Sequence, residues 1–191
     1  MPKTVPVLLV VFLTLYMQSA NPPIPSAPSL HPAPEMQKLL NAFSGTWSLE
    51  LRIEPSKQLP KGGGGSGEEV WRPGPGGLSL IEDYHSKGDD GEISGLGVAW
   101  WDESAQRFQI TWCDNGTPAG CGVLKGGAKW EDNAVVALDE WEMNGKKFTF
   151  KEVFSDITPT SFKQTLYLGE GGGEWKKVET ILATRAPSLN Q

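Results

Sequence analysis

The sequence predicts one all-β domain, an antiparallel up-and-down barrel of about ten strands with a short helix capping its N-terminal end. Short stretches in which apolar and polar residues alternate follow one another along the chain, and turn-forming segments separate them. Glycine (23), proline (15) and tryptophan (8) are abundant in the 191 residues, as suits a protein with many turns and aromatic strands. Because a long meander leaves two unpaired edges, closing it into a barrel is the simplest arrangement.

Residues 1–20 have the pattern of an export signal. Lys3 precedes an apolar run over residues 5–17, and Gln18-Ser19-Ala20 provides a small-residue cleavage site. The run is shorter than the ~20 apolar residues that span a bilayer, so we expect no stable transmembrane span. No Cys follows it directly, which excludes a lipoprotein anchor. We therefore expect export to a periplasmic or extracellular location, with an uncleaved N-terminal anchor as the alternative.

The next segments lead into the barrel domain, predicted over residues 35–186. Residues 21–34 contain six prolines and no periodic pattern, which predicts an extended tether. Residues 35–43 carry apolar side chains at helical spacing, and Ser44-Gly45 ends this predicted helix. Residues 187–191 are expected to form a short tail.

From residue 46 onward the pattern is strand, turn, strand. The clearest hairpin signal is the Asn-Gly pair in "MNGKK", and the glycine run at residues 62–65 is interpreted as a flexible loop at the barrel mouth. Strands are expected near residues 46–54, 68–72, 78–87, 92–101, 106–114, 119–125, 133–142, 147–155, 160–169 and 174–184.

The two cysteines flank one of these turns. Cys113 and Cys121 enclose "DNGTPAG", so both can lie on facing strands of one hairpin. Because export leads to an oxidising compartment, we expect them to form a disulfide. Two free thiols are the alternative, and a metal site is disfavoured because no His or second Cys pair lies near.

Four segments together carry a resemblance to a known family. They are "SGTW" at 44–47, "GLGVAWWDESAQRFQITWCDNGTPAG" at 95–120, "FKEVFSD" at 150–156 and "KKVETILATR" at 176–185. In this order they resemble an uncharacterised family of exported bacterial calycin-like, or lipocalin-like, β-barrels, a domain of unknown function. The resemblance covers residues 36–186. It implies the barrel fold and brings no catalytic residue and no cofactor.

Several classes of function are disfavoured by composition. The net charge is −6 with no basic block, so nucleic acid would be repelled. The two histidines, His31 and His85, lie in the tether and beside a turn, so His-assisted nucleophilic catalysis is not expected. The haem-binding nitrobindins, another branch of such barrels, use a His near the C-terminus, and here no His follows His85. We predict neither a metal nor another cofactor.

Some strand faces place a carboxylate among apolar neighbours. Glu152 alternates with phenylalanines, Glu82 lies between Leu80 and Tyr84, and Glu179 precedes Ile181 on one face. A carboxylate in such surroundings is costly unless paired, and it can mark a binding cavity. The alternative is that these faces point to solvent. The candidate ligand-binding residues in the lumen are Glu82, Tyr84, Trp100, Trp112, Trp141, Glu152 and Glu179.

Three functional hypotheses follow. The first is an exported, non-catalytic barrel that binds a small apolar or amphipathic molecule in its lumen. The second is an envelope enzyme that uses paired lumen carboxylates such as Glu82 and Glu152. The third is a structural envelope protein with a filled core. The sequence predicts neither the ligand's identity nor the oligomeric state.

The resemblance also suggests how the capped end is held. In lipocalins an Arg of the last strand packs over the Trp of the Gly-x-Trp motif. Here Gly45-Thr46-Trp47 opens the first strand, and Arg185 ends the last one. We therefore expect a structural latch between Trp47 and Arg185, with a solvated Arg185 at a fraying terminus as the alternative.

Overall fold

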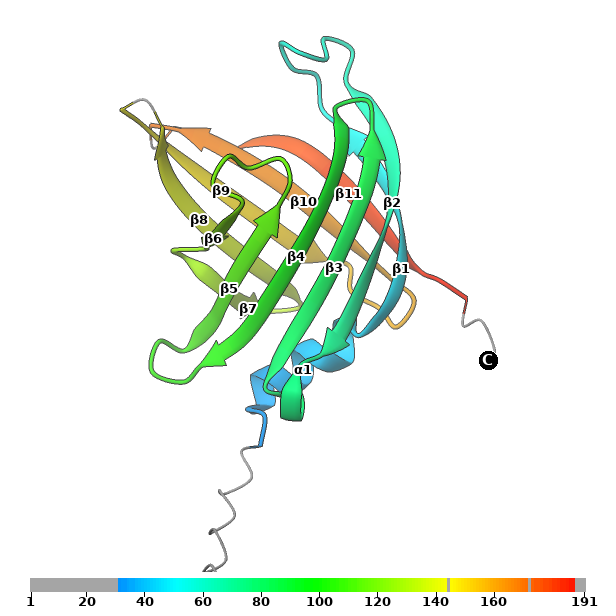
Figure 1. The fold of residues 1–191 in the computed structure, drawn as a ribbon, viewed down its shortest axis with the longest axis vertical. Helices are drawn as coiled ribbons and strands as arrows, with labels where there is room; N and C mark the ends of the chain where they lie inside the picture. Colours follow the sequence, from blue (N-terminus) through cyan, green and yellow to red (C-terminus); the bar gives the residue numbers. More distant parts are fainter. Residues whose placement is uncertain (1–30, 144, 172, 188–191) are drawn as a thin grey trace, which may run out of the picture.

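A computed structural model describes residues 31–143, 145–171 and 173–187. The predicted export signal over residues 1–20, most of the predicted tether and most of the predicted tail lie outside the described residues. The described chain is one helix followed by one antiparallel sheet that closes on itself (Figure 1).

The helix is α1 (Pro34–Phe43), and a 3-10 turn, η1 (Pro75–Gly77), links the second and third strands. The strands are β1 (Gly45–Ile53), β2 (Gly63–Pro73), β3 (Ser79–Gly88), β4 (Gly91–Asp102), β5 (Arg107–Asp114), β6 (Cys121–Val123), β7 (Gly127–Glu131), β8 (Ala134–Met143), β9 (Lys146–Ser155), β10 (Ser161–Glu170) and β11 (Lys176–Arg185).

The first and last strands close the barrel. β1 pairs with β11 from Trp47 opposite Arg185 to Ile53 opposite Glu179, and it pairs with β2 on its other side. The shortest strand pairing around the barrel is between β5 and β7, which pair only at Phe108 and Ala128. The predicted all-β, up-and-down barrel with a capping helix is therefore confirmed.

Two details of the sequence prediction were wrong. Residues 63–65 of the glycine run are part of strand β2 and do not form a loop. Gly65 lies opposite Gly88, and a Cβ on Gly65 would come within 2.7 Å of the Gly88 Cα, so two glycines let these strands approach closely. In addition, β7 is a strand that the prediction lacked, between the short β6 and β8.

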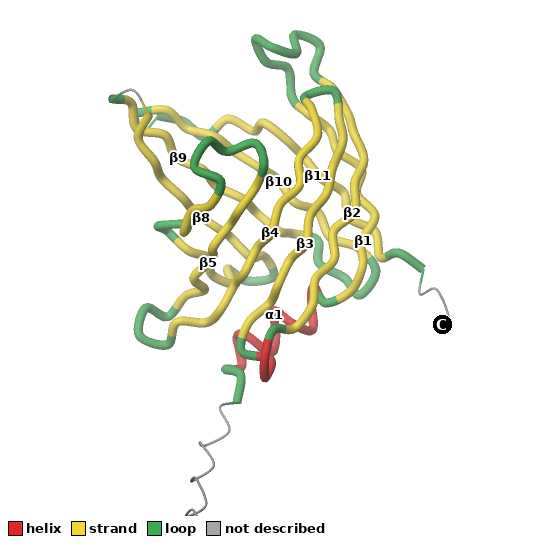
Figure 2. The backbone as a smooth tube through the Cα atoms, in the orientation of Figure 1, coloured by secondary structure: helices red, strands yellow, loops and turns green. Residues whose placement is uncertain are grey.

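Helix α1 closes one end of the barrel, as Figures 1 and 2 show at the bottom of the view. Its residues Met36, Leu39, Leu40 and Phe43 are all buried, because apolar side chains at this spacing form one helix face. The Phe43 ring contacts Trp71, Phe154 and Phe162 at centroid distances of 5.6, 5.4 and 5.2 Å. These aromatic contacts fill the helix end of the barrel, which we call the floor.

Burial of the inward-facing residues decreases with distance from the helix. On β9, Phe154 is buried near the floor, whereas Phe150 and Phe148 are partly exposed. On β10, Phe162 and Gln164 are buried, and Leu168 is 37% exposed. The barrel is therefore packed at the helix end and less buried toward the opposite end, where the β1–β2 loop and the β3–β4 turn lie (Figure 2).

Candidate functional site: an acidic lumen

Four glutamates face the lumen from four strands. Glu69 lies on β2, Glu82 on β3, Glu152 on β9 and Glu179 on β11. Strand alternation places each of them on the same side as buried apolar residues, as with Glu69 beside Trp71 and Glu152 beside Phe154. The lumen above the floor is therefore acidic as well as aromatic.

Glu69 is the most deeply buried of these acids. Its side chain is 0% exposed, and no described residue forms a hydrogen bond with either carboxylate oxygen. The Trp71 indole N–H lies near enough to favour the charged form of Glu69, yet it makes no hydrogen bond of good geometry and is itself unpartnered. Such a group costs free energy on folding unless something else satisfies it.

Glu82 has space for its side chain, and Glu152 has a hydrogen-bond partner. Glu82 is 8% exposed, and Gly97 on β4 leaves room for it, since a Cβ on Gly97 would come within 2.8 Å of Glu82 Oε2. Glu152 accepts a short hydrogen bond from Gln164 Nε2, whereas the buried Gln164 Oε1 has no partner among the described residues.

Burial raises the pKa values of these four carboxyls toward neutral pH or beyond it. Burial raises the pKa of Glu69 to about 8, with a further contribution from Glu152. Burial also raises the pKa of Glu82, and the charges of Glu69 and Glu152 add to this increase. The pKa of Glu152 is raised to about 7 by burial, which the Gln164 hydrogen bond only partly offsets. Burial likewise raises the pKa of Glu179 to about 7.

Basic side chains do not balance this charge. None of the ion pairs in the described part of the chain includes any of the four lumen glutamates. Lys151 precedes Glu152 and faces outward. Lys177 follows a register shift in the β10–β11 pairing and forms an ion pair with Glu54. The carboxyls are therefore free of any internal counter-ion.

Most of the predicted lumen residues lie on the inner face. Tyr84 is partly buried, burial raises its pKa, and its ring meets Trp112 at a centroid distance of 6.0 Å. The Trp112 indole donates to Asp114 Oδ2 at 2.7 Å. Trp141 lies at the open end, 36% exposed and stacked on Phe148. With Glu82, Glu152 and Glu179, these residues surround the same space.

Trp100 is the exception, and its predicted place in the lumen was wrong. Ala99 and Trp101 face inward, and the Trp101 ring packs on Phe108 at 5.1 Å, so Trp100 faces outward and is 37% exposed. The sequence prediction was out of register by one residue on β4, and a one-residue shift exchanges the two faces of a strand.

Sequence reasoning missed Glu69, Trp71 and Gln164. The alternation of Glu69 and Trp71 with Val70 and Arg72 was available as a signal on β2. For Gln164, the alternation with Phe162 on β10 was the corresponding signal. These three residues carry the unpartnered polar atoms of the lumen.

The two predicted structural pairs come together in space. Cys113 and Cys121 lie opposite each other on β5 and β6 and form a disulfide. The Arg185 guanidinium lies 4.1 Å from the centroid of the Trp47 ring and donates to Ser44 O at 2.9 Å. The Trp47 indole donates to Phe43 O at 2.7 Å, which ties the last helical residue to β1.

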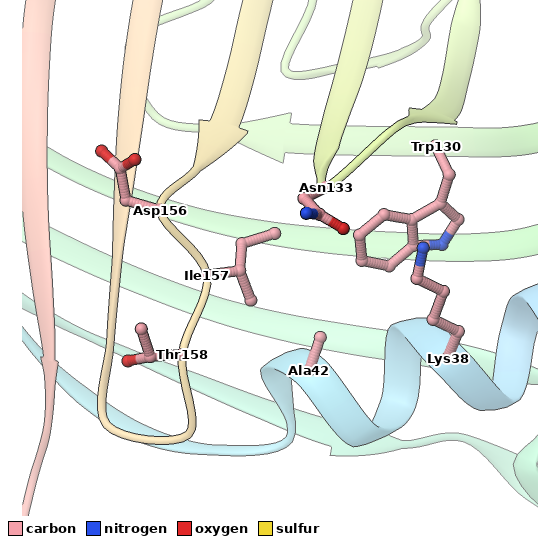
Figure 3. A pocket seen from close by; sticks show the side chains of 7 residues that line it. All are labelled: Lys38, Ala42, Trp130, Asn133, Asp156, Ile157 and Thr158. Atoms are coloured by element: carbon pink, nitrogen blue, oxygen red, sulfur yellow. The ribbon is translucent and has the colours of Figure 1, made fainter.

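A separate pocket of about 600 Å³ lies at the closed end, outside the lumen (Figure 3). Helix α1 contributes Lys38 and Ala42, and the β9–β10 loop contributes Ile157. Lys38 Nζ lies 3.7 Å from the centroid of the Trp130 ring, so the helix partly covers this wall of the pocket. The pocket shares no lining residue with the acidic lumen.

The described residues contain neither a metal-binding cluster nor a membrane-spanning helix. No group of three His, Cys, Asp or Glu side chains in this part of the chain is arranged to hold a metal ion. Across the same residues, no helix combines the length and hydrophobicity that crossing a membrane requires.

Comparison with known proteins identifies a family and a fold. A family model described as "Protein of unknown function (DUF1579)" matches residues 32–185. This match, together with the barrel, confirms the resemblance to an uncharacterised calycin-like family. A search of the curated proteins found no match to this sequence.

Solved structures share the barrel at low sequence identity. Rv2717c from M. tuberculosis is 13% identical, with 82% of this chain and 99% of that chain covered and a TM-score of 0.54. The S-type phycobiliprotein lyase CPES from Guillardia theta is 11% identical, with 81% and 94% covered and a TM-score of 0.53. A redesigned β-barrel, mFAP1, bound to DFHBI is 17% identical, with 80% and 100% covered and a TM-score of 0.40.

Proposed function

The chain belongs to the DUF1579 family of proteins of unknown function, and from its own lumen we propose that it is an exported, non-catalytic barrel that binds a small amphipathic molecule. The observation that carries this proposal is the combination of inward-facing aromatic residues that stay partly exposed with buried, unpartnered polar atoms on Glu69, Trp71 and Gln164. Ligand sites are mostly apolar cavities with a few such convergent polar groups.

The distribution of burial supports binding over a purely structural role. A filled structural barrel would bury its inward-facing aromatic residues along the whole length. Here Phe148, Phe150 and Trp112 are partly exposed although they face inward. Aromatic side chains at the wall and polar groups below them suit a ligand with an apolar body and one polar end.

Native mass spectrometry of the protein purified from its producing cells tests this proposal. We expect an additional mass that is lost on denaturation. Leu166→Trp, on the inner face between Glu152 and Glu179, should fill the lumen and remove this mass. Tyr167→Trp, one residue along and facing outward, is the matched control and should retain it. A wild-type protein that carries only its own mass would contradict the proposal.

A second function, acid–base catalysis, is favoured by one observation. The pKa values of Glu69 and Glu152, about 8 and about 7, lie near neutral pH, where a general acid or base is most effective. The two functions differ in the fate of the bound molecule. A binding protein returns it with unchanged mass after prolonged incubation, whereas an enzyme returns a product.

A further inference from the structure

We propose that the ligand of this lumen is an organic cation, an ammonium group attached to an apolar body. This inference rests on the proposed function and specifies the chemical class of the molecule bound.

The unpartnered atoms in the lumen are mainly hydrogen-bond acceptors. Glu69 Oε1, Glu69 Oε2 and Gln164 Oε1 are buried oxygens without a partner, and all three are acceptors once Glu69 is ionised. The Trp71 indole N–H, on the same strand as Glu69, is an unpartnered donor. Glu69, Trp71 and Gln164 are 0%, 8% and 5% exposed, so bulk water does not satisfy them. An ammonium group supplies up to three donors, and no acceptor, to such a site.

The charge of the lumen leads to the same class of ligand. Four carboxyls face it, and the ion pairs of the described chain leave all four without a cation. An anionic ligand would meet like charge with no basic group to hold it, whereas an ammonium group would pair with a carboxylate in a low-dielectric space. The partly exposed rings of Phe148, Phe150 and Trp112 can face the apolar body or the cation itself.

Binding should be coupled to proton release. Glu69 is largely protonated at pH 7 in the free protein, since its pKa is about 8. A bound ammonium stabilises the carboxylate, so the Glu69 proton passes to the solvent as the ion pair forms. Burial also raises the pKa of Glu82 on β3, Glu152 on β9 and Glu179 on β11, so these carboxyls contribute to the net release. Tyr84 on β3, Asp114 on β5 and Asp139 on β8 face the same space.

Calorimetric titration of the full chain with three probes of the same shape tests the inference. The probes are 2-naphthylmethylammonium, 2-naphthylmethanol and 2-naphthoate, at pH 7.5 in phosphate and in Tris. We expect the ammonium to bind roughly tenfold or more tightly than the alcohol, since one charged hydrogen bond suffices for that ratio. Its apparent enthalpy should differ between the two buffers because protons are released.

Two matched variants test whether Glu69 causes the preference for the ammonium. Glu69→Gln should reduce the affinity for the ammonium about tenfold more than it reduces the affinity for the alcohol. Glu68→Gln, one residue away on the exposed face of β2, should change neither. Glu152→Gln provides a second lumen variant should Glu69→Gln fail to fold.

The outcomes separate the two proposals. Equal affinity for alcohol and ammonium would overturn the cation inference and leave lumen binding intact, as would tighter binding of the carboxylate. If none of the three probes binds to the folded protein, lumen binding and the cation inference both fail.

Discussion

Glu69 has the most unusual environment of any residue in the described structure. It is an acid without a hydrogen-bond partner in the described structure, enclosed by the inner faces of β1 and β3, where Trp47 and Tyr84 are its register neighbours. A glutamine of almost the same shape would occupy this position without the cost of burying a charge. Under the proposed function, a bound ligand supplies the partner that this acid lacks.

The burial of Glu69 makes stability depend on pH in an unusual direction. Its pKa is about 8 in the folded protein and 4.5 when exposed. Between these values the folded state holds the proton and the unfolded state releases it, so stability falls as the pH rises. Each unit of difference in pKa corresponds to about 1.4 kcal/mol.

We therefore expect the melting temperature of the wild-type protein to fall between pH 5 and pH 9. Glu69→Gln should flatten this slope and melt several degrees higher than the wild type at pH 9. Glu68→Gln, exposed on the same strand, is the control and should follow the wild type. Thermal unfolding followed by circular dichroism measures all three, and parallel curves for the two variants would refute the buried, protonated Glu69.

The Trp47–Arg185 contact supports a second prediction at this scale. The guanidinium stacks on a fully buried indole and also donates to Ser44 O and Pro159 O, so it joins three segments at the closed end. A stacked pair of this kind contributes about 0.5–2 kcal/mol. A double-mutant cycle with Trp47→Phe and Arg185→Lys should show a coupling above about 0.5 kcal/mol. Additive losses would mean that Arg185 does not act as a latch.

The sequence predicted inner-face residues where alternation was uninterrupted, as around Glu152 and Glu82. It failed at Trp100 and Trp101, because both are tryptophans and the pattern does not tell which one faces inward. Register against β3 and β5 decides this, and register is a tertiary property.

Strand β2 shows a second limit, at the scale of the element. It begins within a run of four glycines, residues 62–65, which have little intrinsic strand preference, so the sequence suggested a loop. Pairing with β1 on one side and β3 on the other makes Gly63–Gly65 a strand. With this strand shortened in the prediction, Glu69 lay near an expected terminus and was not considered a lumen residue.

The β5–β6 hairpin is stabilised by its disulfide, which closes a short loop at the edge of β5 that also pairs with β7. In the chain-entropy model a loop of this size contributes about 2.5 kcal/mol. We expect Cys113→Ser with Cys121→Ser to lower the free energy of unfolding by about this amount, as measured by urea titration. Peptide mapping without reductant should find one bridge, and two alkylatable thiols in the native exported protein would contradict it.

The whole molecule combines a solid floor with a less filled upper lumen. The floor is fixed by α1 and the Trp47–Arg185 contact, so that the acids just above it lie in a rigid setting. A site held by rigid strands loses little entropy on binding. The overall architecture could be predicted from the sequence pattern and the family resemblance. The unpartnered polar atoms could not, because finding them requires knowing how the side chains pack.

Export is a separate prediction at the scale of the whole chain. If residues 1–20 are a cleaved signal, the mature protein begins near residue 21, loses Lys3 and changes its net charge from −6 to −7. Intact-mass measurement and N-terminal sequencing of the protein from culture medium or periplasm check this. An exported, soluble form that retains Met1 would contradict it.

The most direct test of an acidic, ligand-binding lumen is the ¹³C NMR titration of the Glu69 side-chain carboxyl, without ligand and at saturation with 2-naphthylmethylammonium. In the free protein we predict a pKa of about 8. With the ammonium bound, this pKa should fall toward the ordinary value of 4.5, because the cation favours the carboxylate. A Glu69 pKa that is already ordinary in the free protein, or one that the saturating cation leaves unchanged, would contradict the account.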